Sequence, residues 1–463
     1  MYKISIVFIL ISSFSFSQEG ISYASVDSAS YSDFVKADFK SIRKLGKKAK
    51  NEKIDFFYLR MRLGIVSYDK KKYEYAVIHF EKAYAMNPAE LITQEYLYYT
   101  YLFSGRVDQA QVLAESLSES FQKSVGLKIK KTESIAIGFQ DFSNTNISDN
   151  SARKYLDPSF KRGDAVINGK TFGINITLEN RLNSRTHIYN KISVFKTNSM
   201  GVEQFTSTPG AAATATNPVI PATLASLKEV NYKNNQFQYN FGISRLTKGN
   251  LLLSAGFGFY KTNTSDLLVQ PLITQSGYPI NPFGSLTYKE GKTSYNNISV
   301  SFNIGKRLRY ISPSLGFSYS NLYNTNQFQG EGGIIYYPFG NTHFYGKTSF
   351  AYISNNEVHQ SVFTQKIGFK ITQNIWLDGL YSLGNHSNYI SDIGFSIYNT
   401  ADPVLSNLNV NLHFYVKKVE FILGYSSQNR QAHFNQYSSS TVYSTAYYQY
   451  TNTNFLTTIK WNF

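Results

Sequence analysis

Histidines are the side chains of this chain with the widest chemical range, because an imidazole can exchange a proton near neutral pH or bind a metal ion. Two of the seven, His359 and His386, fall near the ends of neighbouring segments joined by a short link at Thr372-Gln373. If their rings met, they could share a metal ion or relay a proton to a serine, as a hydrolase requires. A third, His413, is the next candidate for a base.

The spacing around these histidines argues against such chemistry. Side chains of an extended strand alternate between two faces. This puts His359 on an apolar face with Phe363 and Ile367, and His386 on the opposite face. A shared site would therefore need a bulge in the strand. His413 shares its face with asparagines and a tyrosine, where a histidine more often belongs to a hydrogen-bonded structural network.

Other sequence signatures of chemistry are equally weak. No serine has the context of a nucleophile elbow, and the chain contains no phosphate-binding glycine loop, zinc motif or calcium loop. Because the chain contains no cysteine, disulfides and thiolate metal sites are excluded. We predict that the protein is not an enzyme and assign it no catalytic, cofactor-binding or metal-binding residue. An outer-membrane lipid hydrolase is kept as an alternative. It would be established if the purified protein released fatty acid from lipid and if His413→Ala abolished that release.

The elements that carry these residues alternate between apolar and polar positions. At the C-terminus Ile459, Trp461 and Phe463 alternate with Lys460 and Asn462. A strand with one apolar and one polar face fits a closed transmembrane barrel, because closure satisfies every backbone hydrogen bond within lipid. The alternation also predicts a lumen with charges of both signs: Glu179, Lys191, Lys347, Lys366, Lys370, Asp378, Glu420 and Lys460.

The connections between the strands predict their number. Short links, for example at Asn183-Ser184-Arg185 and Lys417-Lys418, alternate with long ones. This predicts about 14 antiparallel strands with both chain ends in the periplasm, since periplasmic turns are short and bacterial single-chain barrels have even strand numbers. Parity then places Ile390 to Tyr398, which reads as one further strand, in an extracellular loop. The segment Thr206 to Leu224 could fold inward as a plug, although a mobile outer loop is commoner.

Composition supports an exported membrane barrel. Tyr and Phe number 37 and 35, charged residues make up 16%, and mean hydropathy is −0.28. The first 17 residues have one lysine followed by a short apolar run, as in a signal peptide. The net charge of +16 would suggest nucleic acid in a cytosolic protein, but export removes that argument. We predict a signal peptide (1–17), a periplasmic helical domain (18–130) and an outer-membrane β-barrel (131–463).

Residues 31 to 123 have helical periodicity. A frame of about 34 residues that ends at Pro88 puts Gly64, Tyr73, Ala76 and Phe80 where a tetratricopeptide repeat (TPR) needs them. A degenerate second repeat follows. A preceding amphipathic helix, about Tyr31 to Lys50, carries basic residues that we assign as a speculative partner-binding surface, with a merely solvated face as the alternative. These residues are Lys36, Lys40, Arg43, Lys44 and Lys47.

Taken together, these segments resemble a Bacteroidota outer-membrane barrel protein with an N-terminal TPR-like module. The junction Ser17-Gln18 is similar to signal-peptide junctions of that phylum, and Gly394 to Asn399 followed by Asp402 resembles a loop of the YaiO-like barrel family. Trp461 and Phe463 resemble the C-terminal signal that such barrels present to the barrel assembly machinery. A further likeness to exopolysaccharide export porins implies helical repeats before a barrel.

We predict a non-enzymatic outer-membrane protein whose periplasmic helices bind a partner protein in an envelope assembly or export complex. A solute or polysaccharide channel is the first alternative, and the lipid hydrolase is the second. The predicted partners are outer-membrane lipid, the barrel assembly machinery during insertion, and a periplasmic or outer-membrane protein. No cofactor and no nucleic acid is expected. Conductance across a planar bilayer would distinguish the channel from the adaptor.

Overall fold

The computed structural model describes residues 21–125, 131–145, 162–207, 224–271, 286–355, 358–400, 402–438 and 443–463. The predicted signal peptide and most of Thr206 to Leu224 lie outside these ranges. The chain forms two compact units, Met1–Ser104 and Gly105–Phe463. Residues from Gly105 onward, which were predicted with the helical domain, therefore cluster with the barrel.

The first unit is helical. Gly64 of the third helix faces the ring of Phe80 in the fourth, and a Cβ at Gly64 would lie 2.5 Å from that ring. This close approach is the one that the repeat frame predicted, and the repeat assignment itself stays a prediction. The helices of the unit are α1 (Tyr23–Val35), α2 (Phe39–Asn51), α3 (Phe57–Asp69), α4 (Tyr73–Met86) and α5 (Leu91–Phe103).

The predicted single helix from Tyr31 to Lys50 is wrong. The chain breaks between α1 and α2 at Ala37, whose φ is +53°, and Asp38 then caps α2 by accepting a hydrogen bond from the Ser41 backbone N–H. Because Lys36 belongs to the end of α1, it does not share one continuous helix face with Lys40. All five residues of the predicted basic surface are exposed.

The second unit is a closed barrel, in which the described residues form 14 antiparallel strands. The predicted fold class and strand number are therefore confirmed. The barrel strands are β1 (Thr132–Asn144), β2 (Arg162–Asn183), β3 (Thr186–Ser207), β4 (Leu224–Leu246), β5 (Leu251–Pro271), β6 (Leu286–Lys306), β7 (Ile311–Ser320), β8 (Gln327–Tyr336), β9 (Phe344–Ser354), β10 (His359–Lys370), β11 (Ile375–Gly384), β14 (Val404–Val416), β15 (Val419–Tyr437) and β16 (Tyr443–Asn462).

Exposure along β6 shows which face meets lipid. Val300 and Phe302 expose 50% and 47% of their surface, whereas Ser299 and Ser301 expose 1% and 2%. Apolar side chains thus point outward and small polar ones point into a filled lumen, as membrane barrels require. No helix among the described residues is both long enough and apolar enough to span a membrane.

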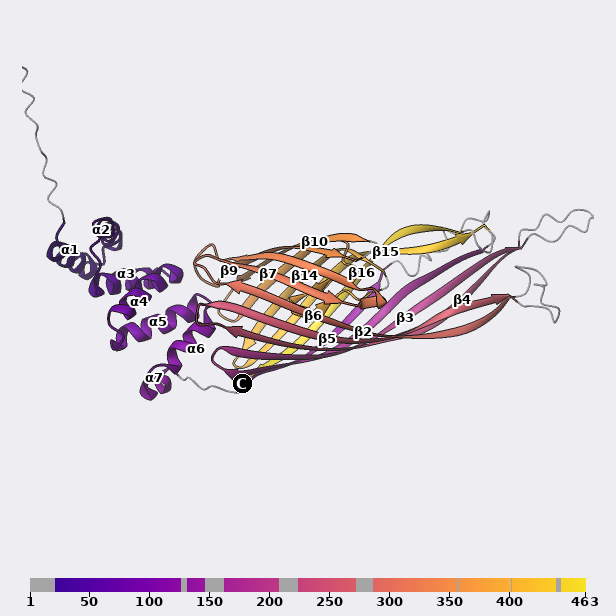
Figure 1. The fold of residues 1–463 in the computed structure, drawn as a ribbon, viewed down its shortest axis with the longest axis horizontal. Coiled ribbons are helices and arrows are strands. Elements are labelled where there is room, and N and C mark those ends of the chain that lie inside the picture. Colours follow the sequence, from indigo (N-terminus) through magenta and orange to yellow (C-terminus); the bar gives the residue numbers. More distant parts are fainter. Residues whose placement is uncertain are drawn as a thin grey trace, which may run out of the picture. The chain divides into compact units, whose positions relative to one another are not determined.

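The two ends of the barrel differ. At the short-turn end, adjacent strands are joined by brief links such as Lys417-Lys418 between β14 and β15. At the long-loop end, β2 to β6 continue well beyond β7 to β10, as Figure 1 shows. The sequence also predicts a long connection over residues 198 to 231; its described parts, 198–207 and 224–231, belong to β3 and β4 instead. There β15 also pairs with β2 around a small apolar core that includes Phe434 and Tyr448.

Two short helices, α6 (Val107–Glu115) and α7 (Glu119–Ser124), precede the barrel in the second unit. Asp108 of α6 contacts His187 Nε2 at 2.8 Å and Arg181 at 3.7 Å. Glu133 contacts the other nitrogen of His187 at 2.8 Å and accepts a hydrogen bond from Arg181 at 2.7 Å. These four side chains, the rim cluster, fix the first turn of α6 at the short-turn end of the lumen.

Candidate functional site: two cavities in the barrel lumen

The segment between β11 and β14, residues 385–403, folds into the lumen. It contains β12 (Ile390–Ser391), the short 3₁₀ helix η3 (Asp392–Gly394) and β13 (Ser396–Ile397). The sequence analysis was right that Ile390 to Tyr398 is not a barrel strand and wrong that it lies in an extracellular loop. We call residues 385–403 the inward segment.

Side chains of the wall hold the inward segment through its backbone. A loop in a lumen must satisfy its peptide groups there, and long amide side chains reach far enough to do so. Gln329 both donates to and accepts from Ile390, at 2.6 and 3.0 Å. The other wall side chains that donate to the segment's carbonyl oxygens are Asn240 to Gly394 (2.6 Å), Gln327 to Asn388 (2.7 Å), Lys191 to Phe395 (2.9 Å), Tyr260 to Gly394 (3.4 Å) and Gln360 to Ser387.

Two glycines of the wall give the segment room. A Cβ at Gly256 would lie 1.9 Å from the carbonyl oxygen of Ile393, so any side chain there collides with backbone. A Cβ at Gly242 would lie 2.6 Å from the ring of Phe395. The absent side chains on β5 and β4 thus form the seat on which the middle of the inward segment rests.

The end of the inward segment is anchored at the opposite wall. Asp402, which is 4% exposed, accepts hydrogen bonds from Asn168 of β2 and from the Tyr450 hydroxyl of β16, both at 2.7 Å. Burial raises the pKa of the Asp402 carboxyl, and the two donors act against that shift. The segment therefore contacts walls on both sides of the lumen.

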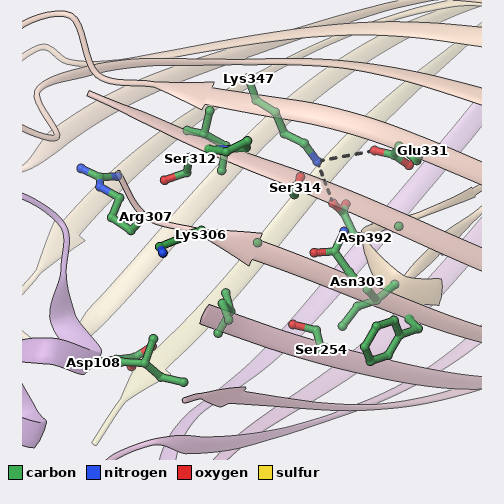
Figure 2. Close-up of a pocket in the computed structure, with 18 of the residues that line it drawn as sticks. Asp108, Ser254, Asn303, Lys306, Arg307, Ser312, Ser314, Glu331, Lys347 and Asp392 are labelled. Atoms are coloured by element: carbon green, nitrogen blue, oxygen red, sulfur yellow. Dashed lines mark ion pairs between the residues drawn. The ribbon is translucent and has the colours of Figure 1, made fainter. Parts of the chain in front are cut away.

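On the short-turn side of the segment lies a cavity of about 470 Å³, the short-turn cavity. Its walls come from α6, the short-turn ends of β4 to β9, and η3. Figure 2 shows Lys347 between Glu331 and Asp392, each 4.0 Å away, with Lys306, Arg307 and Asp108 nearer the rim. This cavity therefore carries charges of both signs.

On the other side lies a second cavity of about 320 Å³, the long-loop cavity. Its described lining contains no carboxylate, and its two cations are engaged: Lys191 bonds Phe395, and Arg430 donates to Gln428 at 2.6 Å. Twelve of its lining residues have amide side chains: Gln140, Asn168, Asn234, Asn235, Gln236, Gln238, Asn399, Asn407, Asn409, Gln428, Asn452 and Asn454.

Several residues that line the long-loop cavity also have a polar side-chain atom that is buried in the surrounding wall without a hydrogen bond to any described residue. Four of these atoms are asparagine Oδ1 atoms, and the remaining two are an amide nitrogen and a hydroxyl oxygen. In the short-turn cavity, no side-chain oxygen of the described lining residues has this property. The six atoms are Oδ1 of Asn399, Asn407, Asn452 and Asn454, Nε2 of Gln236 and Oγ1 of Thr262.

Most of the predicted lumen charges form ion pairs, whereas Lys191 donates to a backbone carbonyl oxygen and the Lys370 ammonium lies 5.7 Å from the centroid of the Trp376 ring. Lys460 contacts Glu179 at 2.9 Å, and Lys366 contacts Asp378 at 3.3 Å. His413 lies between Asp378 and Glu420, at 2.6 and 2.7 Å, so both ring nitrogens are used. This is the hydrogen-bonded network that the alternation predicted for His413.

The other two candidate histidines have different surroundings. His359 is exposed and stacks on Tyr352, with ring centroids 6.0 Å apart. His386 is fully buried, and its ring contacts the carbonyl oxygens of Gly384 and Val404 and the Ser382 hydroxyl, all at 2.8 Å. Burial lowers the pKa of His386. Among the described residues, no cluster of three or more His, Asp and Glu side chains is arranged to hold a metal ion.

Sequence reasoning missed both cavities. The local signal was available in part, because Ile390, Ile393, Phe395 and Ile397 are too apolar for a solvated loop. That pattern first reads as a strand, and the parity of the barrel excludes a strand. An apolar segment that is neither wall nor solvated loop has the lumen as its remaining place.

No protein-family model matches the chain, and no curated protein matches its sequence. Solved structures are similar to it in fold. The toluene transporter TodX of Pseudomonas putida is 9% identical, with 72% of this chain and 91% of TodX covered and a TM-score of 0.41. A FadL homologue of Pseudomonas aeruginosa is 9% identical, with 72% and 90% covered and a TM-score of 0.43. The translocator domain of the autotransporter NalP from Neisseria meningitidis is 10% identical, with 79% and 99% covered and a TM-score of 0.30.

In fold, this chain is an outer-membrane β-barrel. On the comparison with TodX and the FadL homologue, the predicted partner-binding adaptor is wrong and the solute-channel alternative is favoured. At 9 to 10% identity the likeness reaches no further than the fold.

Proposed function

We propose that this protein is an outer-membrane channel for polar solutes, closed in this conformation by the inward segment. The observation that carries the proposal is the placement of residues 385–403 between two polar cavities of one lumen. Ile393 lines the short-turn cavity, and Phe395, two residues later, lines the long-loop cavity. Movement of this segment alone would join the cavities, because the rest of the wall is a continuous sheet.

The proposed orientation puts the short-turn end in the periplasm and the long-loop end outside the cell, as short turns in such barrels generally indicate. The helical unit, TPR-like in its spacing, would then be periplasmic. Trp461 and Phe463 are 47% and 49% exposed on the lipid side of the final strand, which supports their role as the signal for barrel insertion. The junction at Ser17-Gln18 supports export by an organism of the Bacteroidota type.

The test compares the full-length protein in planar bilayers with a variant in which Asn388–Asn399 is replaced by four Gly and Ser residues. The cut leaves β11 and β14 paired, because the backbone N–H of His386 bonds to the carbonyl oxygen of Val404 outside the deleted stretch. We expect the intact protein to be closed most of the time and the variant to conduct steadily. Heat-modifiable migration in gels verifies that each barrel is folded.

A second variant keeps the chain length. Gln327→Ala with Gln329→Ala removes the amides that hold Asn388 and Ile390. The matched control is Gln449→Ala, whose amide bonds Asn429 instead. We expect frequent openings in the double variant and none beyond the intact protein in the control. A folded deletion variant that conducts no more than the intact protein would refute the channel.

A further inference from the structure

We infer that the long-loop cavity is a binding site for a short, neutral, hydroxyl-rich solute, chemically an oligosaccharide. The inference rests on the proposed channel function, since it names the class of solute that the channel would admit. It draws on three independent properties of the cavity: its hydrogen-bonding atoms, its charge, and its aromatic faces.

The cavity is lined by groups that both donate and accept hydrogen bonds. Asn407, Asn452 and Asn454, with nine further amide side chains, line the same space. Each amide offers a carbonyl oxygen as acceptor and an NH₂ group as donor. A sugar hydroxyl donates one hydrogen bond and accepts others, so a string of hydroxyls answers several amides at once.

The charge of the cavity selects against cationic solutes. No carboxylate is among its described lining residues, so a cation finds no counter-ion there and would be desolvated at a cost. The Lys191 ammonium is directed to the Phe395 carbonyl oxygen, and the Arg430 guanidinium to Gln428. An anionic solute would have to draw these two groups away from those oxygens. A neutral solute loses only hydrogen bonds with water, and the amides replace those bonds.

Aromatic side chains complete the site. Phe142, Phe195 and Phe395 line the same cavity as the amides, together with Tyr323 and Tyr398. Sugars have polar edges and apolar C–H faces, and an aromatic face beside hydrogen-bonding groups suits both. The cavity volume of about 320 Å³ lies near the lower end of the range for ligand pockets, about 300 to 1,000 Å³. A few sugar rings would fill it, whereas a polymer would have to thread through it.

The experiment is isothermal titration calorimetry on the full-length protein in detergent. The neutral probes are maltotriose, cellotriose, xylotriose and triacetylchitotriose. Trigalacturonic acid is the acidic probe and toluene the apolar probe. We expect saturable binding of at least one neutral trisaccharide. We expect no binding of trigalacturonic acid or of toluene. Saturation-transfer NMR on the intact protein repeats the measurement without any substitution.

Two substitutions on β16 locate the site, and a third is their matched control. Asn452→Leu and Asn454→Leu each remove one buried amide from the long-loop cavity while preserving side-chain size. Asn303→Leu makes the same change in the short-turn cavity. Loss of one partner of a buried polar contact predicts about tenfold weaker binding in each β16 variant. We expect less than a twofold change in Asn303→Leu.

The outcomes separate this inference from the channel itself. It is overturned if no neutral trisaccharide binds, if the acidic or apolar probe binds instead, or if the β16 variants bind like the intact protein, which would mean that water alone satisfies the amides. If binding fails while the deletion variant conducts, the channel stands without this solute. If binding follows the β16 variants while the folded deletion variant stays closed, the binding site stands and the channel does not.

Discussion

The two cavities share one lumen but differ in the polar groups of their walls and in how those groups are paired. In the short-turn cavity Lys347 has Glu331 and Asp392 on either side, each 4.0 Å away. The long-loop cavity has no carboxylate among its described lining residues, and twelve amide side chains line it. Opposite charges on neighbouring strands can neutralise each other across a narrow lumen. Amide side chains each carry both a donor and an acceptor, so the wall that is rich in them is the one we assign to recognition.

The inward segment matches this division residue by residue. Its η3 turn brings Asp392 to the ionic side, and its later residues Tyr398, Asn399 and Thr400 line the amide side. A segment that served only to block the lumen would not need different chemistry on its two faces. Its composition is therefore part of both cavity walls.

The largest expected effect comes from displacing the inward segment, which separates the two cavities. Gly256→Val places a side chain where Ile393 backbone now lies, 1.9 Å from the position of the new Cβ. Because backbone cannot move aside as a side chain can, we expect the middle of the inward segment to leave its seat and the two cavities to merge. Single-channel recording should show an open probability at least about tenfold higher, the ratio that a displaced equilibrium of about 1.4 kcal/mol gives.

The control for this effect is Gly330→Val, which adds the same group to β8 at a position with no atom within 4 Å of the new Cβ. Its conductance should equal that of the intact protein. If Gly256→Val folds and stays closed like Gly330→Val, the inward segment does not separate the cavities.

The second effect tests whether ion selectivity belongs to the short-turn cavity and oligosaccharide binding to the long-loop cavity. In a channel opened by Gly256→Val, Lys347→Met removes a positive charge from the short-turn cavity while Glu331 and Asp392 remain. We expect the cation-to-anion permeability ratio, measured from reversal potentials in a KCl gradient, to rise by roughly twofold to fivefold. Oligosaccharide binding should not change when Lys347→Met is made in the otherwise intact protein.

Asn454→Leu should do the reverse: it should weaken oligosaccharide binding in the otherwise intact protein and leave the reversal potential of the Gly256→Val channel in place. Each variant is thus the control of the other. A common response of both quantities to either substitution would show that the cavities act as one site.

The wall of this barrel was predictable because its signal is local. Outward rows such as Ile298, Val300 and Phe302 repeat every second residue, and short turns mark one end of the strands. The rule that such barrels have an even number of strands then gave about 14, and the closed sheet confirms that number. Strand length was underestimated on the long-loop side, because there the strands leave the membrane and lose the apolar face that marks them.

The place of the inward segment was not predictable from such patterns. Its hydrogen-bond partners lie far away in sequence: 61 residues separate Gln329 from Ile390, and 154 separate Asn240 from Gly394. The seat at Gly256 is a missing side chain, and a glycine in a strand has several other meanings. The long-loop cavity follows from this placement, since amides from several strands face it only once the barrel is closed.

A third, smaller effect concerns the short-turn cavity alone. Asp108→Asn removes the carboxylate that His187 and Arg181 contact, so the first turn of α6 loses its charge-assisted bonds to the barrel. We expect backbone amides of α6 to exchange about tenfold faster with deuterium, the result of a loss of about 1 to 2 kcal/mol.

Glu115→Gln, at the other end of α6, is the matched control and should leave exchange within about twofold. Oligosaccharide affinity should be the same in both variants, because Asp108 lines only the short-turn cavity. A fall in that affinity in Asp108→Asn would mean that the rim cluster and the long-loop cavity are coupled.

The smallest effect lies in the helical unit. Because this unit contains neither cavity, its response to low pH serves as an internal reference for the response of the barrel. Hydrogen bonds from the Arg60 side chain hold the pKa of Asp55 below its ordinary value of 3.8, with one of them at 2.7 Å. As pH falls, the unfolded unit therefore takes up this proton first. The stabilisation is complete above the unfolded pKa and is lost as pH falls through the lower folded pKa.

Because Asp55 is partly exposed, we expect this contribution to stay below about 1 kcal/mol. Deuterium exchange in α3, corrected for intrinsic rates, should be constant from about pH 5 to 8 and should rise by less than about fivefold below pH 4. Asp55→Asn should remove the rise. Oligosaccharide binding should not follow the same titration, since no carboxylate is among the described residues that line the long-loop cavity. If affinity fell in parallel with the exchange in α3, the neutral site would depend on an acidic group, and its contrast with the ionic cavity would be lost.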